Sequence, residues 1–230
     1  MAFDPVLLIM QPRLIDEAID SLKNIDIPRV WFRAFTEPQV MAQMNKYIKE
    51  TNYSHYIIMS DDGVVSKQSA DAILKYGERT KEDVFTGWMK MHLEKDDSYS
   101  HISTVYPGTL SVFDTGIGPE REDYPPPAPM QWVVNQPGFI RTAVANFAMS
   151  IAPRELFLDY PLKTWPNGRA SDHYWSLQLQ FGGIKIWTHP EAFVKHLRKG
   201  WSPLRKNWLV GKVKPEIIFE GKWRSRKDYV

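Results

Sequence analysis

Along the first part of the chain, short runs of apolar residues alternate with longer segments in which apolar and polar residues are mixed. Short apolar runs, typical of strands covered on both faces, occupy 6–10, 29–35, 55–59 and 82–89. Between them, apolar positions recur at helical spacing and predict helices over 14–24, from 36 onward and after Ser66. This alternation predicts an α/β domain with a mostly parallel central sheet flanked by helices.

Two of the predicted helices carry start signals. Thr36 is suited to the N-cap of the second helix, and Pro38 falls in its first turn. Ser66 is suited to the N-cap of the third helix, whose apolar face includes Ala70 and Ile73. Right-handed crossovers place the carboxyl end of every parallel strand on one edge of the sheet, where ligands bind in such domains.

The second half of the chain is less regular. Residues 94–131 are rich in Gly, Pro and polar residues, and they predict a long irregular loop of the kind that forms lids or stays disordered. Order is expected to resume at 132–134, followed by a strand over 145–151 and a short helix that starts at Pro153. A helix over 171–181, ended by Gly182 and Gly183, and a strand over 184–188 then complete the domain.

Composition narrows the class of protein. A chain of 230 residues that is 43% hydrophobic can bury one core, so residues 1–197 are predicted to form one domain with the loop 94–131 inside it. The absence of cysteine excludes disulfides, thiolate zinc sites and a cysteine nucleophile, and it suits a cytoplasmic setting. The first residues lack the basic segment and long apolar run of a signal peptide, so we expect a soluble protein.

Charge is distributed unevenly. Residues 195–230 hold 11 Lys and Arg against 3 acids, whereas the rest of the chain holds 18 against 24. The segment 198–230 is therefore interpreted as a basic C-terminal extension. Such a tail on an acidic body indicates a polyanionic partner, a membrane surface or nucleic acid, or else a solvated tail that aids solubility.

Two adjacent aspartates, Asp61 and Asp62, directly follow the third predicted strand. Their mutual repulsion requires either that water solvates both carboxylates in an Asp-Asp-Gly turn or that a cation neutralises them. Carboxylates are ligands for Mg²⁺ or Mn²⁺, which complete their shell with water and substrate phosphates. The position at the carboxyl edge of the sheet favours the cation.

Other candidate chemistry lies late in the chain. Ser171 and Asp172 begin the predicted helix 171–181, where they are either caps or, for Asp172, a general base toward an acceptor hydroxyl. His189 and His196 are acceptable additional ligands for Mn²⁺. The sequence contains no G-x-G-x-x-G after the first strand, no P-loop motif and no H-E-x-x-H motif.

Taken together, the order of these segments resembles the GT-A fold of nucleotide-sugar glycosyltransferases, closest to the family 2 type, over roughly residues 5–197. The stretch YIIMSDDGVVSKQSADAIL resembles the strand, Asp-x-Asp motif and following helix of that family, with Ser60 in place of the first acid. The stretch GRASDHYWSLQLQFGGIKIWTHPEAFVKH resembles the segment that holds the Glu-Asp base motif and a late histidine. There Ser171 replaces the usual Glu.

The resemblance implies a three-layer, Rossmann-like domain and an inverting, metal-dependent transfer of a sugar from a UDP- or GDP-sugar to a glycan, lipid or protein acceptor. Asp172 would be the catalytic base. Asp61, Asp62 and His196 would hold Mn²⁺ or Mg²⁺, with His189 the less favoured histidine. The residues implied to contact the donor are Gln11, Arg13, Arg33, Ser60 and Asp61, with Glu37 the other polar residue near the nucleoside. Those implied at the acceptor or lid are Trp132, Tyr124 and Ser171.

Two rival functions remain open. One is a metal-dependent nucleotidyltransferase, although the Gln11-Pro12-Arg13 turn offers no glycine for a phosphate loop. The other is a non-catalytic module that binds a glycan or polyanion through the basic tail and the aromatic residues of the loop. The tail sequence GKWRSRKDYV also suits peripheral contact with a membrane, and nucleic acid is the less expected partner.

Overall fold

The computed structural model describes residues 2–10, 15–33, 37–91, 102–107, 127–164, 171–197 and 216–221. Within these residues the main sheet has eight strands in the order β12–β2–β1–β3–β9–β5–β10–β8. Their bounds are β1 Pro5–Met10, β2 Arg29–Arg33, β3 His55–Ser60, β5 Val84–Thr86, β8 Ile140–Thr142, β9 Ser150–Pro153, β10 Ile186–Thr188 and β12 Glu216–Gly221. Strands β1, β2, β3, β5 and β10 run in one direction, and β8, β9 and β12 run against them.

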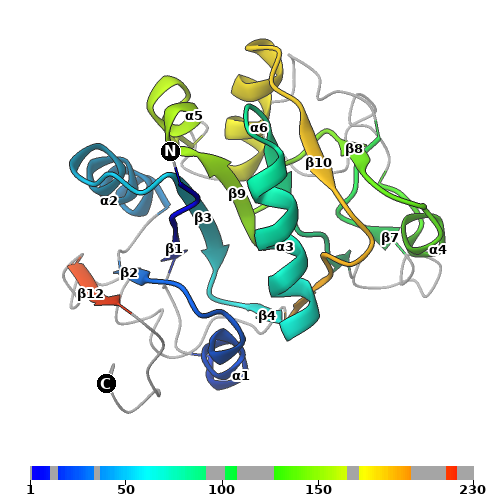
Figure 1. Cartoon of the computed structure of the whole chain (residues 1–230), viewed down its shortest axis with the longest axis horizontal. Coiled ribbons are helices and arrows are strands. Elements are labelled where there is room, and N and C mark those ends of the chain that lie inside the picture. Colours follow the sequence, from blue (N-terminus) through cyan, green and yellow to red (C-terminus); the bar gives the residue numbers. More distant parts are fainter. Residues whose placement is uncertain are drawn as a thin grey trace.

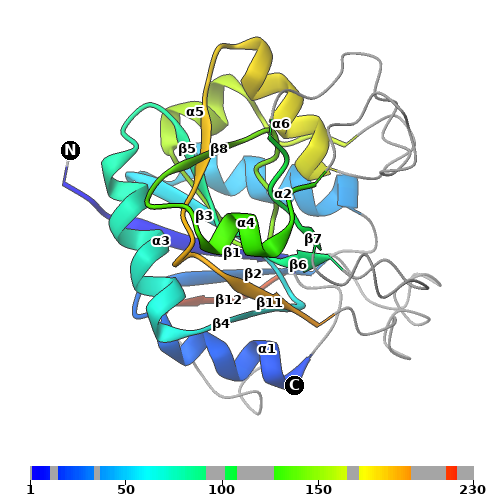
Figure 2. The ribbon, with the colours of Figure 1, turned by 90° about the vertical axis from the view of Figure 1, so that its right-hand side faces the viewer.

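Helices cover both faces of this sheet (Figure 1). On one face lie α2 (Glu37–Glu50), α5 (Arg154–Asp159) and α6 (Ser171–Phe181). On the other lie α1 (Asp16–Ser21), its 3₁₀ continuation Leu22–Asn24, and α3 (Lys67–Arg79). Figure 2 shows α2, α5 and α6 above β1 and β2, with α1 below them. The predicted α/β domain with a mostly parallel sheet flanked by helices is confirmed.

The core follows from the alternation of side chains along the buried strands. Val6 and Leu8 of β1 pack under the layer of α2, α5 and α6, whereas Leu7 and Ile9 pack against α1 and α3. Every residue of β1 is buried because β2 and β3 flank it and helices cover both its faces. A central strand of this kind reads as a continuous apolar run in the sequence.

Two small sheets accompany the main one. Strand β4 (Gly63–Val65) pairs with β11 (Val194–His196), and β6 (Lys90–Met91) pairs with β7 (Ile102–Ser103). The short helix α4 (Met130–Val134) precedes β8. The part of 94–131 that the structure describes therefore contains β7 and the start of α4, in a segment predicted to be irregular.

The sequence predictions for individual helix caps and strands were partly confirmed. Ser66 caps α3 as predicted, because its Oγ accepts a hydrogen bond from the backbone N–H of Ser69 at 3.1 Å. Thr36 lies outside the described residues. The predicted strand 145–151 was misplaced: β9 begins only at Ser150, because the preceding residues form a turn in which Asn146 Nδ2 donates to the carbonyl of Gly87 at 2.8 Å.

The order of the strands marks the place where a ligand is expected to bind. The chain passes from β1 to β2 on one side and then crosses to β3 on the other side of β1. In open α/β sheets, ligands bind outside the carboxyl ends of the strands at such a reversal. Strand β3 ends there with Ser60, and Asp61 and Asp62 follow it.

Candidate functional site

Both aspartates that follow β3 are buried. Asp61 is 4% exposed and Asp62 is 6% exposed. Asp61 lines a very small cavity with Ile9 and Trp31 against the residues of α1. The predicted Asp-Asp-Gly turn is present at Asp61 and Asp62, but the burial of both residues disagrees with the alternative in which water solvates both carboxylates.

Asp62 is held by two side chains. The hydroxyl of Ser60 donates a hydrogen bond to its Oδ1 at 2.9 Å, and Nε2 of His196 lies 3.1 Å from its Oδ2. A carboxylate only accepts hydrogen bonds, so this contact requires a proton on Nε2 or a cation shared by the two groups. The structure thus brings together two of the three predicted metal ligands.

Pairing of β4 with β11 creates this contact. His196 lies opposite Gly63, and the backbone N–H of Leu197 donates to the carbonyl of Asp62 at 2.9 Å. Gly63 suits the position because a Cβ atom there would lie 3.2 Å from Met59 and 3.3 Å from the carbonyl of Ala148. A larger residue would press on β3 and on the turn before β9.

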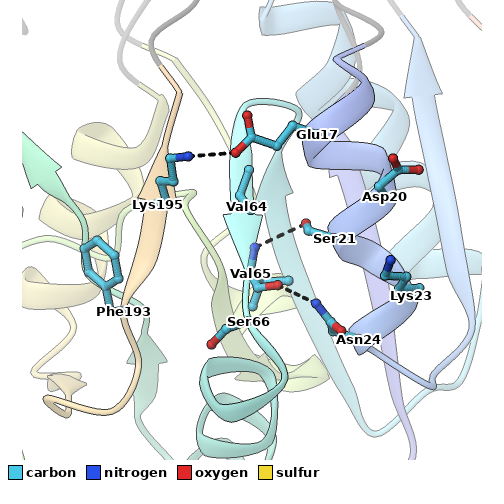
Figure 3. Close-up of a pocket in the computed structure, with 10 residues that line it drawn as sticks. All are labelled: Glu17, Asp20, Ser21, Lys23, Asn24, Val64, Val65, Ser66, Phe193 and Lys195. Atoms are coloured by element: carbon cyan, nitrogen blue, oxygen red, sulfur yellow. Dashed lines mark hydrogen bonds and ion pairs between the residues drawn. The ribbon is translucent and has the colours of Figure 1, made fainter.

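The β4–β11 pair is also fastened to α1, across a groove of about 420 Å³ (Figure 3). Lys195 forms an ion pair with Glu17 at 2.7 Å. The backbone N–H of Val65 donates to Ser21 Oγ at 3.2 Å, and Asn24 Nδ2 donates to the carbonyl of Val65 at 2.8 Å. The two hydrogen bonds satisfy the backbone N–H and carbonyl of Val65, so the end of the strand that follows Asp62 is held against this helix.

The start of α6 meets the start of α2. Ser171 is completely buried, and its Oγ donates to Oε1 of Glu37 at 2.8 Å. The backbone N–H of His173 donates to Oδ1 of Asp172 at 2.9 Å. Because α2 begins just beyond the carboxyl end of β2, Ser171 and Asp172 lie at the same edge of the sheet as Asp62.

A hydrogen-bonded connection links the two parts of the site. Ser176 donates to the carbonyl of Asp172 at 2.6 Å and accepts from the N–H of Ala145 at 2.8 Å. Two residues further on, the carbonyl of Phe147 accepts from the N–H of Ser60 at 2.6 Å. The segment 145–147 therefore fixes the start of α6 relative to the end of β3.

The remaining predicted site residues are less informative. Gln11, Arg13 and Tyr124 lie outside the described residues, and only the backbone of Arg33 is described. Trp132 is a half-exposed residue of α4. His189 packs in an aromatic cluster, with its ring centroid 4.4 Å from that of Tyr76, and burial lowers its pKa while nearby Glu191 opposes this shift.

The sequence did not predict the observed roles of two residues at the site. Glu37 was considered only for the nucleoside, yet its carboxylate accepts a hydrogen bond from Ser171. Ser176 reads in the sequence as an ordinary helix residue, yet it bonds to both Asp172 and Ala145. Their contacts join segments that are distant in the chain, so only the tertiary structure reveals them.

The residues at Asp62 suit a divalent cation in their chemistry. Adjacent ligands of an octahedral ion at about 2.1 Å lie about 3 Å apart, close to the observed separation of Nε2 and Oδ2. An oxygen and an imidazole nitrogen are a donor set that suits Mn²⁺. Within the described ranges, no cluster of three or more His, Asp or Glu side chains is placed to hold a metal. A cation here would need oxygens from water or a substrate.

Comparisons with known proteins identify no family. No family model matches the chain, and no curated protein matches it. A solved structure described as "Crystal Structure of A197 from STIV" has a TM-score of 0.47 and 13% sequence identity, covering 86% of this chain and 96% of that one. A likeness at this level carries no argument about function. Among the described residues, none of the helices has the length and apolar character of a bilayer-spanning segment.

Proposed function

We propose that this protein is a metal-dependent, inverting glycosyltransferase of GT-A type, which moves a sugar from a nucleoside diphosphate to an acceptor hydroxyl. The observation that carries the proposal is the 3.1 Å separation of His196 Nε2 and Asp62 Oδ2 at the carboxyl edge of the sheet. An isolated buried carboxylate is costly, and a cation shared with an imidazole would offset that cost.

Asp62 and His196 would hold the cation, with Asp61 beside them. When bound, Mn²⁺ or Mg²⁺ supplies positive charge against which the leaving diphosphate is stabilised. Ser60 contributes by donating to Oδ1 of Asp62, which leaves Oδ2 directed at His196. This hydrogen bond fixes the rotamer of the carboxylate, so the pair is organised before any ligand arrives.

Asp172 would accept the proton of the attacking hydroxyl. Its Oδ1 already accepts the N–H of His173, which orients the carboxylate and leaves Oδ2 for the acceptor. The side chain is partly exposed, so an acceptor can reach it. Because segment 145–147 bonds to both halves of the site, the proton acceptor and the diphosphate site would keep a fixed spacing during transfer.

The experiment that tests the proposal is a thermal-shift series on the full chain with UDP, GDP, CDP and ADP, each with and without Mn²⁺. A ligand that binds only the folded state stabilises it by about 2.7 kcal/mol at a hundredfold excess over its Kd. We expect one nucleoside diphosphate to stabilise the protein only when Mn²⁺ is present.

Two variants test whether the Mn²⁺-dependent shift arises at Asp62. Asp62→Asn should abolish the Mn²⁺-dependent shift, whereas Asp71→Asn, at an exposed i,i+4 pair with Lys67 on α3, should retain it. If no nucleotide stabilises the wild type, the transferase proposal fails and a non-catalytic binding module becomes the better reading.

A further inference from the structure

A further cavity lies away from the candidate site, with a volume of about 550 Å³. It is formed by the end of α3, the connection to β5, the residue before β8, and β10. Asp83 of this cavity immediately precedes β5, whereas Asp62 follows β3. The cavity is built on β5, β10 and β8 at one end of the strand order, and β9 separates β5 from β3, so the cavity and the candidate site are set apart along the sheet.

Two aromatic rings form a corner of the cavity. Phe139 is 45% exposed, and its ring centroid lies 6.3 Å from that of Trp187 at an interplanar angle of 79°. Behind them, Tyr76 packs edge-on against Phe139 at 5.1 Å, which keeps the exposed ring in place. The corner is therefore a rigid apolar surface that is open to solvent.

Asp83 fixes the second ring. Its Oδ2 accepts the indole N–H of Trp187 at 2.9 Å, and its Oδ1 accepts the backbone N–H of Lys185 at 3.0 Å. Each carboxylate oxygen retains a further lone pair that can accept a hydroxyl. An acceptor group thus lies beside the aromatic corner.

Charge on the lining is balanced. Arg79 and Lys81 are basic, Glu82 and Asp83 are acidic, and Thr80 is neutral. The guanidinium of Arg79 lies over the ring of Tyr76, 5.9 Å from its centroid. A lining with equal numbers of basic and acidic groups favours a neutral ligand over an anion or a cation.

We propose that this cavity binds a neutral sugar residue of a glycan, separately from the candidate active site. A pyranose ring has an apolar face of C–H groups that packs on an aromatic ring, and a rim of hydroxyls that donate and accept hydrogen bonds. Phe139 and Trp187 would supply the apolar contact, and the charged lining would satisfy the hydroxyls. The inference does not depend on the proposed transferase activity, because none of the residues that line the cavity belongs to the candidate active site.

The test is binding of maltose, cellobiose and N,N′-diacetylchitobiose to the full chain, measured by saturation-transfer difference NMR and by calorimetry. We expect at least one disaccharide to bind. Phe139→Ala should weaken that binding about tenfold through loss of one aromatic contact. Phe181→Ala removes an aromatic residue that is 67% exposed at the end of α6, outside the cavity lining, and should leave binding unchanged.

Two further variants test whether the sugar binds in this cavity and whether it binds independently of the candidate site. Glu82→Arg places a long side chain without an aromatic ring on an exposed lining residue and should block binding even if Phe139→Ala folds poorly. Asp62→Asn should leave binding intact, because Asp62 does not line the cavity. Failure of all three disaccharides to bind, binding insensitive to Phe139→Ala and Glu82→Arg, or binding lost in Asp62→Asn would overturn the proposal. Self-association that Phe139→Ala abolishes would also overturn it, since a second copy would then cover the rings.

Discussion

The imidazole Nε2 of His196 lies 3.1 Å from the Oδ2 oxygen of Asp62, although 134 positions separate the two residues in the chain. The contact exists because the three residues of β11 pair with the three residues of β4 directly after the aspartates. Both partners are largely buried, so the pair is shielded from the water that weakens exposed ion pairs. Four predictions follow from this site and from the groups that support the fold.

Removal of the imidazole should weaken binding of a divalent cation. We expect His196→Ala to raise the apparent Kd for Mn²⁺ at least about tenfold in isothermal titration calorimetry, because one of two described donor groups is lost. His55→Ala serves as the control, since His55 begins β3 whereas Asp62 lies just past the end of that strand. Equal Mn²⁺ affinity in the wild type and His196→Ala would show that the histidine holds Asp62 only through a proton.

Loss of the carboxylate at position 172 should affect transfer without affecting the donor site. For Asp172→Asn we expect a fall in transfer rate of about 10²–10⁴-fold, the usual contribution of a positioned general base. The amide retains the hydrogen bond from the N–H of His173, so the start of α6 should keep its conformation. An unchanged Mn²⁺-dependent nucleotide shift is the accompanying readout. A variant that transfers at the wild-type rate would remove Asp172 from the mechanism.

The hydrogen bond between Ser171 and Glu37 should contribute to stability. Ser171→Ala removes the buried donor and leaves the carboxylate without that partner, so we expect the free energy of unfolding to fall by about 1–3 kcal/mol in urea titrations. Glu37→Gln should cost less, because an amide oxygen can still accept from the hydroxyl. If both variants unfold at the wild-type urea concentration, the two helix starts are held together by other contacts.

Acidification should destabilise the protein partly through His55. Burial lowers the pKa of His55, against the opposing effects of Glu155 and Glu78. The folded state therefore resists a proton that the unfolded state accepts below its ordinary pKa of about 6.5. Stability is complete above that value and declines as the pH falls toward the lowered folded-state pKa.

The measurement compares the free energy of unfolding at about pH 7.5 and about pH 5 in the wild type and in His55→Asn, which cannot titrate in this range. We expect a smaller loss in the variant. A residual loss is still expected, because burial lowers the pKa of His189 in the same direction. An identical loss in both proteins would assign the pH dependence to other groups.

Much of the fold could be predicted because its signals are local. The apolar runs that became β1, β2 and β3 reflect strands buried on both faces, and the helical spacing that became α1, α2 and α3 reflects one covered face. Ser66 was identified as a cap because the capping hydrogen bond joins residues three apart. The position of Asp61 and Asp62 at the carboxyl edge followed from the parallel direction of the predicted strands.

Short elements escaped prediction for the opposite reason. Strands β4 and β11 have three residues each, too few for any periodicity to appear, and they exist only because they pair with one another. Strand β9 was misplaced because Ala145–Met149 is as apolar as a strand, while the side chain of Asn146 holds it in a turn by bonding to Gly87 and Ala148.

The sequence by itself determined the α/β alternation, the edge of the sheet at which the acidic residues gather, and the identities of Asp62, Asp172 and His196 as candidates. Only the tertiary structure decided which of them meet: His196 at Asp62, Glu37 at Ser171, and Ser176 between Asp172 and Ala145. The reason is physical. Hydrophobic periodicity records which face of an element is buried, whereas a hydrogen bond between distant segments depends on the register and packing of the assembled chain.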